Sequence, residues 1–479
     1  MDLPSMGLML SNISFRDFRN YETFALDNLG PLTILVGPNA VGKTNAIEGI
    51  QLLTSAASFR HPKVAHLVRG TADSAHVGGL VTDGHRELEL SLDVSEGKRH
   101  HALNGKAKRP VDLKGLIPSV VFTPDDLGFV KGPRSVRLAA LDNLGSQLST
   151  NHYLIKRDYE KVVRYKNRLL KEEASADLIA SINEMLVTCG AQLTCYRSAL
   201  FEKLEPFLTS HYASLSEGRE SFSAFYLPSW KADEASFLTE GAVANAAGGF
   251  GGCQEERMGN SLSLSRDDAR EALSRDLAKR AGEERRRHRS LVGPHADHLG
   301  FFIDGRDAAT FGSQGQQRSI VLAFKLAETA LIREILGQSP LLLLDDVMSE
   351  LDERRREALV SFISSGMQTF VTTTNLSYFN SDLLAEARIV ELFHGAGESQ
   401  GLSAQSACSG PSSLDAARAG GCGPELKREE ESNFLRSNEE HTSVKEGQRL
   451  LSSFYSPVEG HDGPAQMFET DESGKGVES

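Results

Sequence analysis

The stretch Gly37-Pro-Asn-Ala-Val-Gly-Lys-Thr44 decides the fold of this chain. It fits the phosphate-binding pattern G-x-x-x-x-G-K-[ST], and its surroundings suit that pattern. An apolar run of strand length, residues 32–36, precedes it, and residues 45–53 place apolar side chains on one helix face. In such a strand–loop–helix unit, backbone N–H groups and the positive end of the helix dipole attract phosphate oxygens. A chance match in a glycine-rich loop is the alternative, and the flanking strand and helix disfavour it.

Several residue types in this loop suit ATP binding. Gly37 and Gly42 let the backbone curl around the phosphates. Lys43 can reach the β- and γ-phosphates, and the Thr44 hydroxyl can bind Mg²⁺. The predicted ATP-binding residues are Gly37, Pro38, Asn39, Ala40, Val41, Gly42, Lys43 and Thr44.

Length and composition narrow the class of protein. The 479 residues allow two or three domains. No apolar run reaches the roughly 18 residues of a membrane span, and the N-terminus lacks the pattern of a signal peptide. The five cysteines show no metal-ligand spacing. We therefore expect a reduced, cytoplasmic protein without a membrane partner.

The net charge of −13 argues at first against a nucleic-acid partner. Its distribution weakens that argument, because the chain from Glu398 onward has 15 acidic and 7 basic residues, a net of −8. The rest of the chain carries only −5, and net charge says little about a local basic stripe.

Strand patterns predict a mixed sheet with an antiparallel layer. Residues 10–15 and 86–94 alternate between apolar and polar, and Asn104-Gly105 is typical of a tight hairpin turn. Core strands are expected at 119–122, 341–346, 369–373 and 388–393, and a further strand at 299–303.

The segment 143–288 is mainly helical in pattern. A second long helix begins near Ile182, and Pro206 should kink or end it. Further helices are expected at 267–288 and 316–336. Residues 234–266 are rich in Gly, Ala and Ser and predict a loop or disordered insert. After His394 the chain is polar and acidic, which predicts a disordered tail.

The first helix expected in the segment 143–288, around residues 155–171, has a basic face opposite its apolar one. Its cations recur at helical spacing, and few acids stand nearby to pair with them. A solvated face is the ordinary alternative, but unpaired cations favour a polyanion. The predicted DNA-binding residues are Arg157, Lys161, Arg164, Arg168 and Lys171.

A second nucleotide motif lies about 300 residues after the first. The run Leu341-Leu-Leu-Leu-Asp-Asp346 fits a Walker B strand, in which Asp345 would hold Mg²⁺ and Asp346 would polarise the attacking water. A buried strand end is the alternative. One α/β sheet would need both motifs at neighbouring strand ends, so the chain between them must leave the sheet and return.

Two further stretches resemble ABC-type ATPases. Ser313-Gln-Gly-Gln316 is similar to their signature motif, and Ser349-Glu-Leu-Asp352 to their D-loop. The resemblance implies that Ser313, Gln314, Gly315 and Gln316 complete the ATP site of a second subunit in a nucleotide-dependent homodimer. Gln314 and Gln316 can equally cap a helix, and Asp352 can equally be an N-cap.

Taken together, the motifs resemble the bacterial RecF family over about residues 8–394. They are Phe18-Arg-Asn-Tyr21, the P-loop, Phe122-Thr-Pro-Asp-Asp-Leu127, Leu291-Val-Gly-Pro-His295, Ser313-Gln-Gly-Gln-Gln-Arg318, Leu343-Leu-Asp-Asp-Val347 and Thr372-Thr-Thr-Asn375. The resemblance implies an α/β ABC/SMC-type P-loop ATPase head with an inserted helical arm. It also implies an ATP-dependent dimer that binds single-strand/double-strand DNA junctions, works with RecR and RecO to load RecA on gaps, and hydrolyses ATP slowly.

The expected division is 1–142 and 289–394 as the two halves of the head, 143–288 as the arm and 395–479 as the tail. The family usually has Arg after Gly-Pro-His, where this chain has Ala296. Arg19 lies either near the nucleotide or on the surface. His100-His101 is either solvated or a metal site.

Three rival classes fit less well. A transporter ATPase would have its Walker motifs much closer together. A longer SMC-type or RecN-type ATPase would need sustained heptads, which the arm lacks. A nuclease with an ABC-type head would need a strand pattern to hold its metal site, and none follows Phe393.

Overall fold

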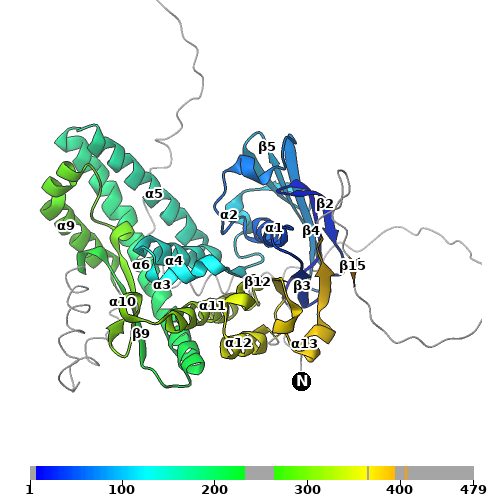
Figure 1. Ribbon diagram of the computed structural model, residues 1–479. Helices are drawn as coiled ribbons and strands as arrows, with labels where there is room; N and C mark the ends of the chain where they lie inside the picture. The colour runs from blue at the N-terminus through cyan, green and yellow to red at the C-terminus, as the bar shows by residue number, and fades with distance from the viewer. Residues whose placement is uncertain (1–6, 232–263, 364–365, 394–404, 407–479) are drawn as a thin grey trace, which may run out of the picture.

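The computed structural model describes residues 7–231, 264–363, 366–393 and 405–406. These residues form a sheet lobe, with two large sheets around α1, and an arm lobe, with the long helices α5, α6 and α9 (Figure 1). Helices α11 and α12 lie between the lobes in both ribbon views.

The P-loop sheet has the strand order β15-β14-β3-β13-β12-β8. All pairs are parallel except β15 with β14. Its strands are short and mostly buried, as the apolar runs in the sequence predict. They are β3 (Leu32–Val36), β8 (Ser119–Phe122), β12 (Leu341–Asp345), β13 (Thr369–Thr373), β14 (Arg388–Glu391) and β15 (Gln405–Ser406).

The second sheet is the expected antiparallel layer, ordered β2-β1-β4-β5-β6-β7. The predicted turn at Asn104-Gly105 joins β6 to β7, with φ of 49° and 70°. Its strands are β1 (Met9–Phe18), β2 (Tyr21–Leu26), β4 (Ser74–Thr82), β5 (Glu87–Ser95), β6 (Lys98–Leu103) and β7 (Lys106–Lys108).

Each face of the P-loop sheet has its own apolar core. On one face, α1 (Lys43–Ser55) is packed with residues of the antiparallel sheet, including Phe15 and Ile50. On the other face, α4 (Arg134–Leu148), α6 (Ala176–Ser216) and α11 (Gln314–Leu336) share a core with Val371 and Leu344. The sheet therefore holds its strand ends rigidly between two packed layers.

The arm lobe consists of antiparallel helices and a small sheet. Helices α5 (Thr150–Lys171) and α9 (Arg266–Arg287) pack on α6, and β9 (Phe222–Leu227) pairs with β10 (His298–Ile303), which pairs with β11 (Arg306–Asp307). The shorter helices are α2 (Pro110–Leu113), α3 (Gly128–Lys131), α10 (Ala308–Phe311), α12 (Glu353–Ile363) and α13 (Ser381–Glu386).

Among the described residues, α6 is the one helix long and apolar enough to cross a membrane by length and composition. Its apolar residues instead contact α5, α9 and α11 within the protein. A core helix of this length meets the same criteria.

The structure corrects several details of the sequence analysis. Pro206 was expected to kink or end its helix; the end is wrong, because α6 continues to Ser216, and the kink stays a prediction. Packing of α6 on α11 holds the backbone helical beyond the missing N–H. The Walker strands are not neighbours either, since β13 lies between β3 and β12.

The predicted domain limits stay predictions, but elements cross them. Helix α4 runs through 142, and β9 pairs with β10 across 288. The predicted insert overlaps the start of α9, which Ser265 caps, and β15 falls within the predicted tail. The rest of the insert and of the tail lies outside the described residues.

Candidate nucleotide site

The P-loop joins β3 to α1, and Lys43 is the first residue of the helix, as predicted. Gly42 has a φ of 117°, a conformation that side chains rarely adopt. At Gly37, a Cβ atom would lie 2.4 Å from the backbone oxygen of Leu392. These two positions therefore require glycine for the loop to curl between its neighbours.

Lys43 lies along the inside of this curl. Its Nζ donates to the carbonyl oxygens of Gly37 and Pro38, at 2.7 and 2.9 Å. Burial lowers the pKa of Lys43, and the nearby charges of Asp346 and Asp345 oppose that effect. The ammonium group is thus held at the loop beside the Walker B carboxylates.

Asp345 joins the end of β12 to the end of β13 and to the first turn of α1. Its Oδ1 accepts hydrogen bonds from the hydroxyls of Thr44, at 2.9 Å, and Thr372, at 2.8 Å. Burial raises the pKa of Asp345, while those hydrogen bonds, Arg60 and Lys43 lower it. Thr372, at the end of the intervening strand β13, is a contact that the Walker patterns alone do not reveal.

Asp346 follows in the left-handed conformation, with a φ of 52°. Its backbone N–H donates to the hydroxyl of Thr372 at 2.9 Å, which turns the chain at the end of β12. Within the described part of the chain, Asp346 Oδ1 is buried without a hydrogen-bond partner. Burial raises the pKa of this carboxyl, and Lys43 opposes the shift.

Residues that follow β1 hold the backbone of the P-loop through hydrogen bonds to its carbonyl groups. Asn20 donates to the carbonyl of Val41 at 3.0 Å, and the hydroxyl of Tyr21 donates to that of Gly42 at 2.8 Å. A Cβ atom at Gly42 would lie 2.6 Å from the Asn20 amide nitrogen. These contacts give the Phe18–Tyr21 motif a structural role that local patterns do not predict.

Of the two expectations for Arg19, the surface position is wrong, and a position near the nucleotide stays a prediction. Its guanidinium donates to both oxygens of Glu48 on α1, at 2.9 and 2.8 Å, and to the carbonyl of His66. Its side chain is 16% exposed and that of Glu48 is fully buried, so Arg19 is not a surface residue. The pair joins the antiparallel sheet to the helix that follows the P-loop.

Arg60 is a site residue that sequence reasoning missed. It donates to the side-chain oxygen of Asn45, in the first turn of α1, at 2.8 Å. Its charge also lowers the pKa of Asp345. Its position just after α1, within a Ser-Phe-Arg run, was the only local signal, and that signal carries no recognisable pattern.

The predicted signature motif lies at the N-terminus of α11. Ser313 is the N-cap, and it forms a reciprocal capping box with Gln316. A Cβ atom at Gly315 would lie 3.2 Å from Arg355, which also bonds Ser319. Ser313 and Gln314 are exposed, so the capped helix end faces outward.

Asp352 is an N-cap, one of its two expected roles. Its side chain accepts from the backbone N–H of Arg355 at 3.0 Å and pairs with the guanidinium of the same residue. Arg355 thereby connects the predicted D-loop to Ser319 in α11, the helix that begins with the predicted signature motif.

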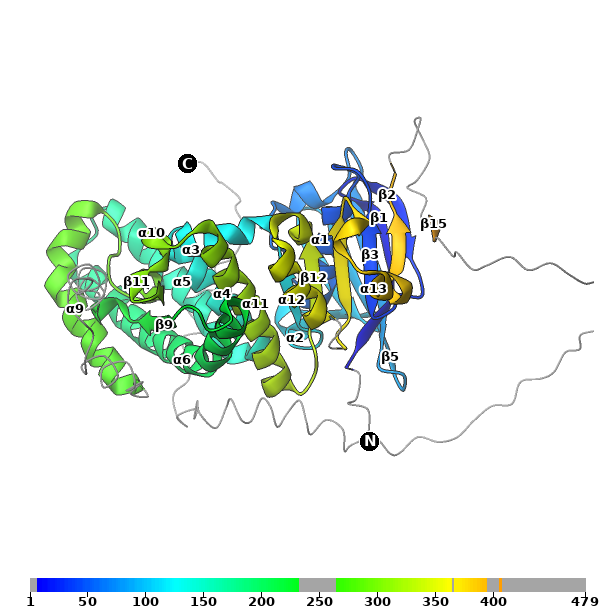
Figure 2. The ribbon, with the colours of Figure 1, turned by 60° about the horizontal axis from the view of Figure 1, so that its bottom comes forward.

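The element before the signature motif and the helix after the P-loop lie in different lobes. Figure 2 shows α10, which ends two residues before Ser313, within the arm lobe, and α1 within the sheet lobe. Figure 1 shows the same separation from another side. The structure thus joins the P-loop to Asp345, whereas α10, next to the signature motif in the chain, lies in the other lobe.

The predicted basic face of α5 is exposed but more fully paired than expected. Arg157 pairs with Asp158 at 3.0 Å. The other pairs are longer: Lys161 with Asp158 at 3.8 Å, Arg164 with Glu160 at 3.8 Å and Arg168 with Glu172 at 3.9 Å. Few acids were expected to pair with these cations, but neighbouring acids pair with four of the five. Such exposed pairs are worth only about 0.2–1 kcal/mol, so the DNA site stays a prediction.

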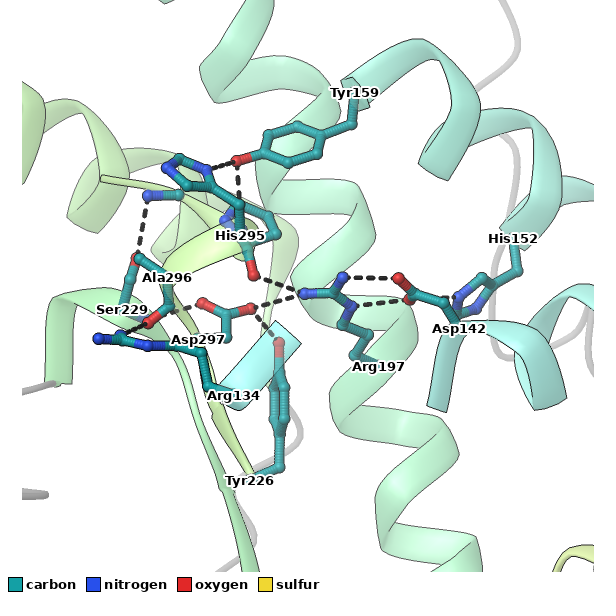
Figure 3. A network of polar contacts seen from close by, with 12 residues as sticks. Arg134, Asp142, His152, Tyr159, Arg197, Tyr226, Ser229, His295, Ala296 and Asp297 are labelled. Atoms are coloured by element: carbon teal, nitrogen blue, oxygen red, sulfur yellow. Dashed lines mark hydrogen bonds and ion pairs between the residues drawn. The ribbon is translucent and has the colours of Figure 1, made fainter. Parts of the chain in front are cut away.

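The Gly-Pro-His segment lies in a buried polar network at the base of the arm. Figure 3 shows Arg197 between two carboxylates, bidentate to Asp142 at 2.8 and 2.7 Å and 3.4 Å from Asp297. Arg197 also donates to the carbonyl of Pro294, and His295 bonds the hydroxyl of Tyr159 at 2.6 Å. The motif therefore ties the loop before β10 to α4, α5 and α6.

At the position of the missing arginine, the structure shows a backbone contact. Arg134, from the start of α4, donates to the carbonyl of Ala296 at 2.9 Å. Any role of an arginine side chain at this position stays untested.

His100 and His101 belong to no cluster of three or more metal-binding side chains, since the described residues contain none. His100 is exposed, as expected, but His101 is 3% exposed. Burial lowers the pKa of His101 to about 4, with the charges of Arg99 and His100 adding to the shift.

Comparison with known proteins agrees with this arrangement. Residues 9–394 match the family model described as the RecF/RecN/SMC N terminal domain. The DNA replication and repair protein RecF of Symbiobacterium thermophilum is 36% identical over 373 residues, which cover 77% of this chain and 92% of that protein. RecF of Halalkalibacterium halodurans is 31% identical over 397 residues, with 82% and 100% covered.

Solved structures give the same result. A structure of the recombination mediator protein RecF-ATPrS in the RecFOR pathway superposes with a TM-score of 0.70 and 27% identity, covering 81% of this chain and 97% of that one. The corresponding RecF-ATP structure gives 0.66 and 28%, covering 81% and 96%. The predicted ABC/SMC-type ATPase fold is confirmed, and the chain belongs to the RecF family of DNA replication and repair proteins.

Proposed function

We propose that this protein is an ATP-gated DNA-binding dimer of recombinational repair and replication. It binds single-strand/double-strand junctions, acts with RecR and RecO to help load RecA on gaps, and does so in the cytoplasm. Its ATP hydrolysis is weak, stimulated by DNA, and works as a switch. The RecF relatives support the repair role, and the two ATP-related RecF structures support the nucleotide.

The main observation in support of a dimer is that the element leading into the signature motif lies in a different lobe from the P-loop of the same chain. The P-loop and Asp345 form one half of an ATP site in the sheet lobe. The exposed, capped start of α11 offers backbone N–H groups to an anion, but it follows directly after α10 in the arm lobe. Two copies related by a twofold axis can each complete the site of the other.

The residues at Asp345 fit Mg²⁺. Thr44 and Asp345 offer the oxygen ligands that this ion prefers, and the buried carboxyl gains a charge partner when the ion binds. Bound there, the ion would neutralise charge on the β- and γ-phosphates. Lys43 contacts the same phosphates, and Thr372 keeps the Asp345 carboxylate aimed at the site.

Asp346 is the proposed base that orients the attacking water. Its buried, unpartnered oxygen, within the described residues, suits this role, because a water can occupy the unused acceptor. Arg60 stands nearby as a further positive group at this end of α1. Hydrolysis then lets the two subunits separate and the DNA dissociate.

The deciding experiment measures molar mass in solution, by light scattering after gel filtration. The Asp346→Asn variant is run with and without Mg-ATP, and with and without gapped duplex DNA. A dimer that forms with ATP and elutes with the DNA supports the proposal. If the variant binds ATP but stays a monomer under all four conditions, the proposal is contradicted.

A further inference from the structure

The side chain of Gln316 makes two hydrogen bonds of opposite direction. Its Oε1 accepts from the backbone N–H of Ser313 at 2.7 Å. Its Nε2 donates to Glu220 Oε1 at 3.0 Å. We propose that Glu220 is a positioning residue for the signature motif, and that it acts by fixing the orientation of the Gln316 amide. The inference rests on the proposed role of Ser313 in a second subunit's ATP site.

Hydrogen-bond chemistry permits only one orientation of this amide. A carboxylate can only accept and a backbone N–H can only donate. The amide between Glu220 and Ser313 must therefore direct its NH₂ group to Glu220 and its oxygen to Ser313. The reverse orientation would lose both hydrogen bonds. The capping box therefore closes with only one orientation of the Gln316 amide.

The closed box has a consequence for anion binding. Because Gln316 occupies the N–H of Ser313 and Ser313 accepts from the N–H of Gln316, the first turn is held in register. The N–H groups of Gln314 and Gly315 and the hydroxyl proton of Ser313 are then left to face an anion. A pre-set donor array binds phosphate without an ordering cost at the moment of contact.

Glu220 is itself held in place from the other side. The hydroxyl of Tyr212 donates to Glu220 Oε2. Tyr212 is fully buried near the end of α6 and stacks on Phe222, with ring centroids 4.4 Å apart. Glu220 stands in the short connection between α6 and β9, at the base of the arm. The arm's longest helix thus reaches the signature motif through two side chains.

The test uses ATP-dependent dimerisation of the full chain in the Asp346→Asn background. Glu220→Lys replaces an acceptor with a donor, so the amide of Gln316 must turn and the capping box opens. Glu220→Gln keeps an acceptor for Gln316. Glu202→Lys makes the same charge change at an exposed position of α6 and serves as the control.

Loss of a helix cap is worth roughly a factor of five at each signature motif, and a dimer contains two of them. We therefore expect Glu220→Lys to raise the dimer dissociation constant about twenty-fivefold. Glu220→Gln and Glu202→Lys should stay within about threefold of the parent, and all three should bind ATP as monomers like the parent. Parent-like dimerisation of Glu220→Lys, or equal weakening by Glu220→Gln, would overturn the inference.

A rescue pair covers the possibility that Glu220→Lys does not fold. Gln316→Glu retains the capping acceptor but places a second carboxylate against Glu220. Adding Glu220→Gln supplies a donor to that new carboxylate and should restore dimerisation. No rescue would count against the inference. Ser313→Arg separates the two claims: if it dimerises with ATP like the parent, the proposed trans site itself is wrong, whatever Glu220 does.

Discussion

The hydroxyl of Thr44 donates a 2.9 Å hydrogen bond to Asp345, although the two residues are 301 positions apart in the chain. Thr44 is in the first turn of α1, and Asp345 ends β12. The P-loop and the Walker B strand are therefore already joined at the place where Mg²⁺ is proposed to bind. The arm is inserted between these two motifs without separating them.

Replacing Lys43 tests the nucleotide site. Lys43→Ala removes the ammonium held at the loop by Gly37 and Pro38, so we expect ATP affinity to fall by at least about a hundredfold. Titration with a fluorescent ATP analogue measures this. Lys43→Arg keeps the charge but not the compact donor, and should retain part of the binding while hydrolysis falls. Unchanged affinity in Lys43→Ala would refute the site.

Asp346→Asn separates nucleotide binding from hydrolysis. The amide cannot accept a proton from water, so we expect turnover to fall by about a hundredfold or more, with Mg-ATP still bound. Phosphate release and nucleotide binding, measured on the same preparation, check both halves. Asp382→Asn makes the same change at an exposed residue of α13 and should leave turnover within a few-fold of the parent. Normal hydrolysis by Asp346→Asn would assign the base elsewhere.

The basic face of α5 predicts a salt-dependent DNA site. The ion pairs of Arg164 and Arg168 are long, and Arg168 also lies over the ring of Tyr165, 4.9 Å from its centroid. Both side chains are exposed, so we expect both to reach phosphates. Changing both to Glu should weaken binding to gapped DNA at any sequence, and should reduce the slope of log affinity against log salt by about 1.8 on duplex. Fluorescence anisotropy at several salt concentrations gives both values.

The matched control for this face is a double reversal on α9. Arg270 and Arg275 are exposed arm residues outside the α5 face, and changing both to Glu should leave the slope unaltered. If the two double variants behave alike, the effect is one of net charge, and the α5 face is not the site.

Local patterns predicted the parts of the fold that local physics controls. The P-loop, its flanking strand and helix, and the Asn104-Gly105 turn follow from residue types and short spacings. The contacts that decide the site's geometry join distant segments. Thr372 reaches Asp345 only because β13 enters the sheet between the Walker strands, and no spacing in the chain records that order.

The same limit explains the wrong expectations. Pro206 was judged by its missing N–H, but helix α11 packs along α6 and keeps it continuous. Arg19 was judged by its neighbours in sequence, but its partner Glu48 is on α1. His101 was judged by its position near a turn, but the pleat of β6 turns it inward and His100 outward.

Burial of His101 is expected to lower the free energy of unfolding of the protein as the pH falls below 6.5. Its pKa in the folded protein is about 4, below the ordinary 6.5, so the unfolded chain binds more protons between those values. Its full contribution is present above pH 6.5 and is lost as pH falls toward 4, by up to about 3 kcal/mol. In His101→Leu, urea unfolding from pH 7 to 4.5 should show a shallower loss. His100→Gln should match the parent, and a His101→Leu variant with the parent's pH slope would contradict the assignment.

Arg197 is expected to be the most costly arm residue to remove. Arg197→Met keeps much of the side-chain volume but leaves Asp142 and Asp297 buried without their cation. Breaking a buried pair in this way costs about 3–5 kcal/mol, measured by urea unfolding at pH 7. Arg134→Met, which removes an exposed contact with the carbonyl of Ala296, should cost less than about 1 kcal/mol.

The pH dependence of this loss identifies its cause. Arg197 lowers the pKa of Asp142, and it opposes the burial that raises the pKa of Asp297 to about 7. Without Arg197, both folded-state pKa values should rise, so the folded variant takes up protons more readily than the parent as pH falls. The difference in unfolding free energy between parent and Arg197→Met should therefore shrink from pH 8 to pH 5. A difference that is constant over this range would mean that lost packing, and not the uncompensated carboxylates, destabilises the variant.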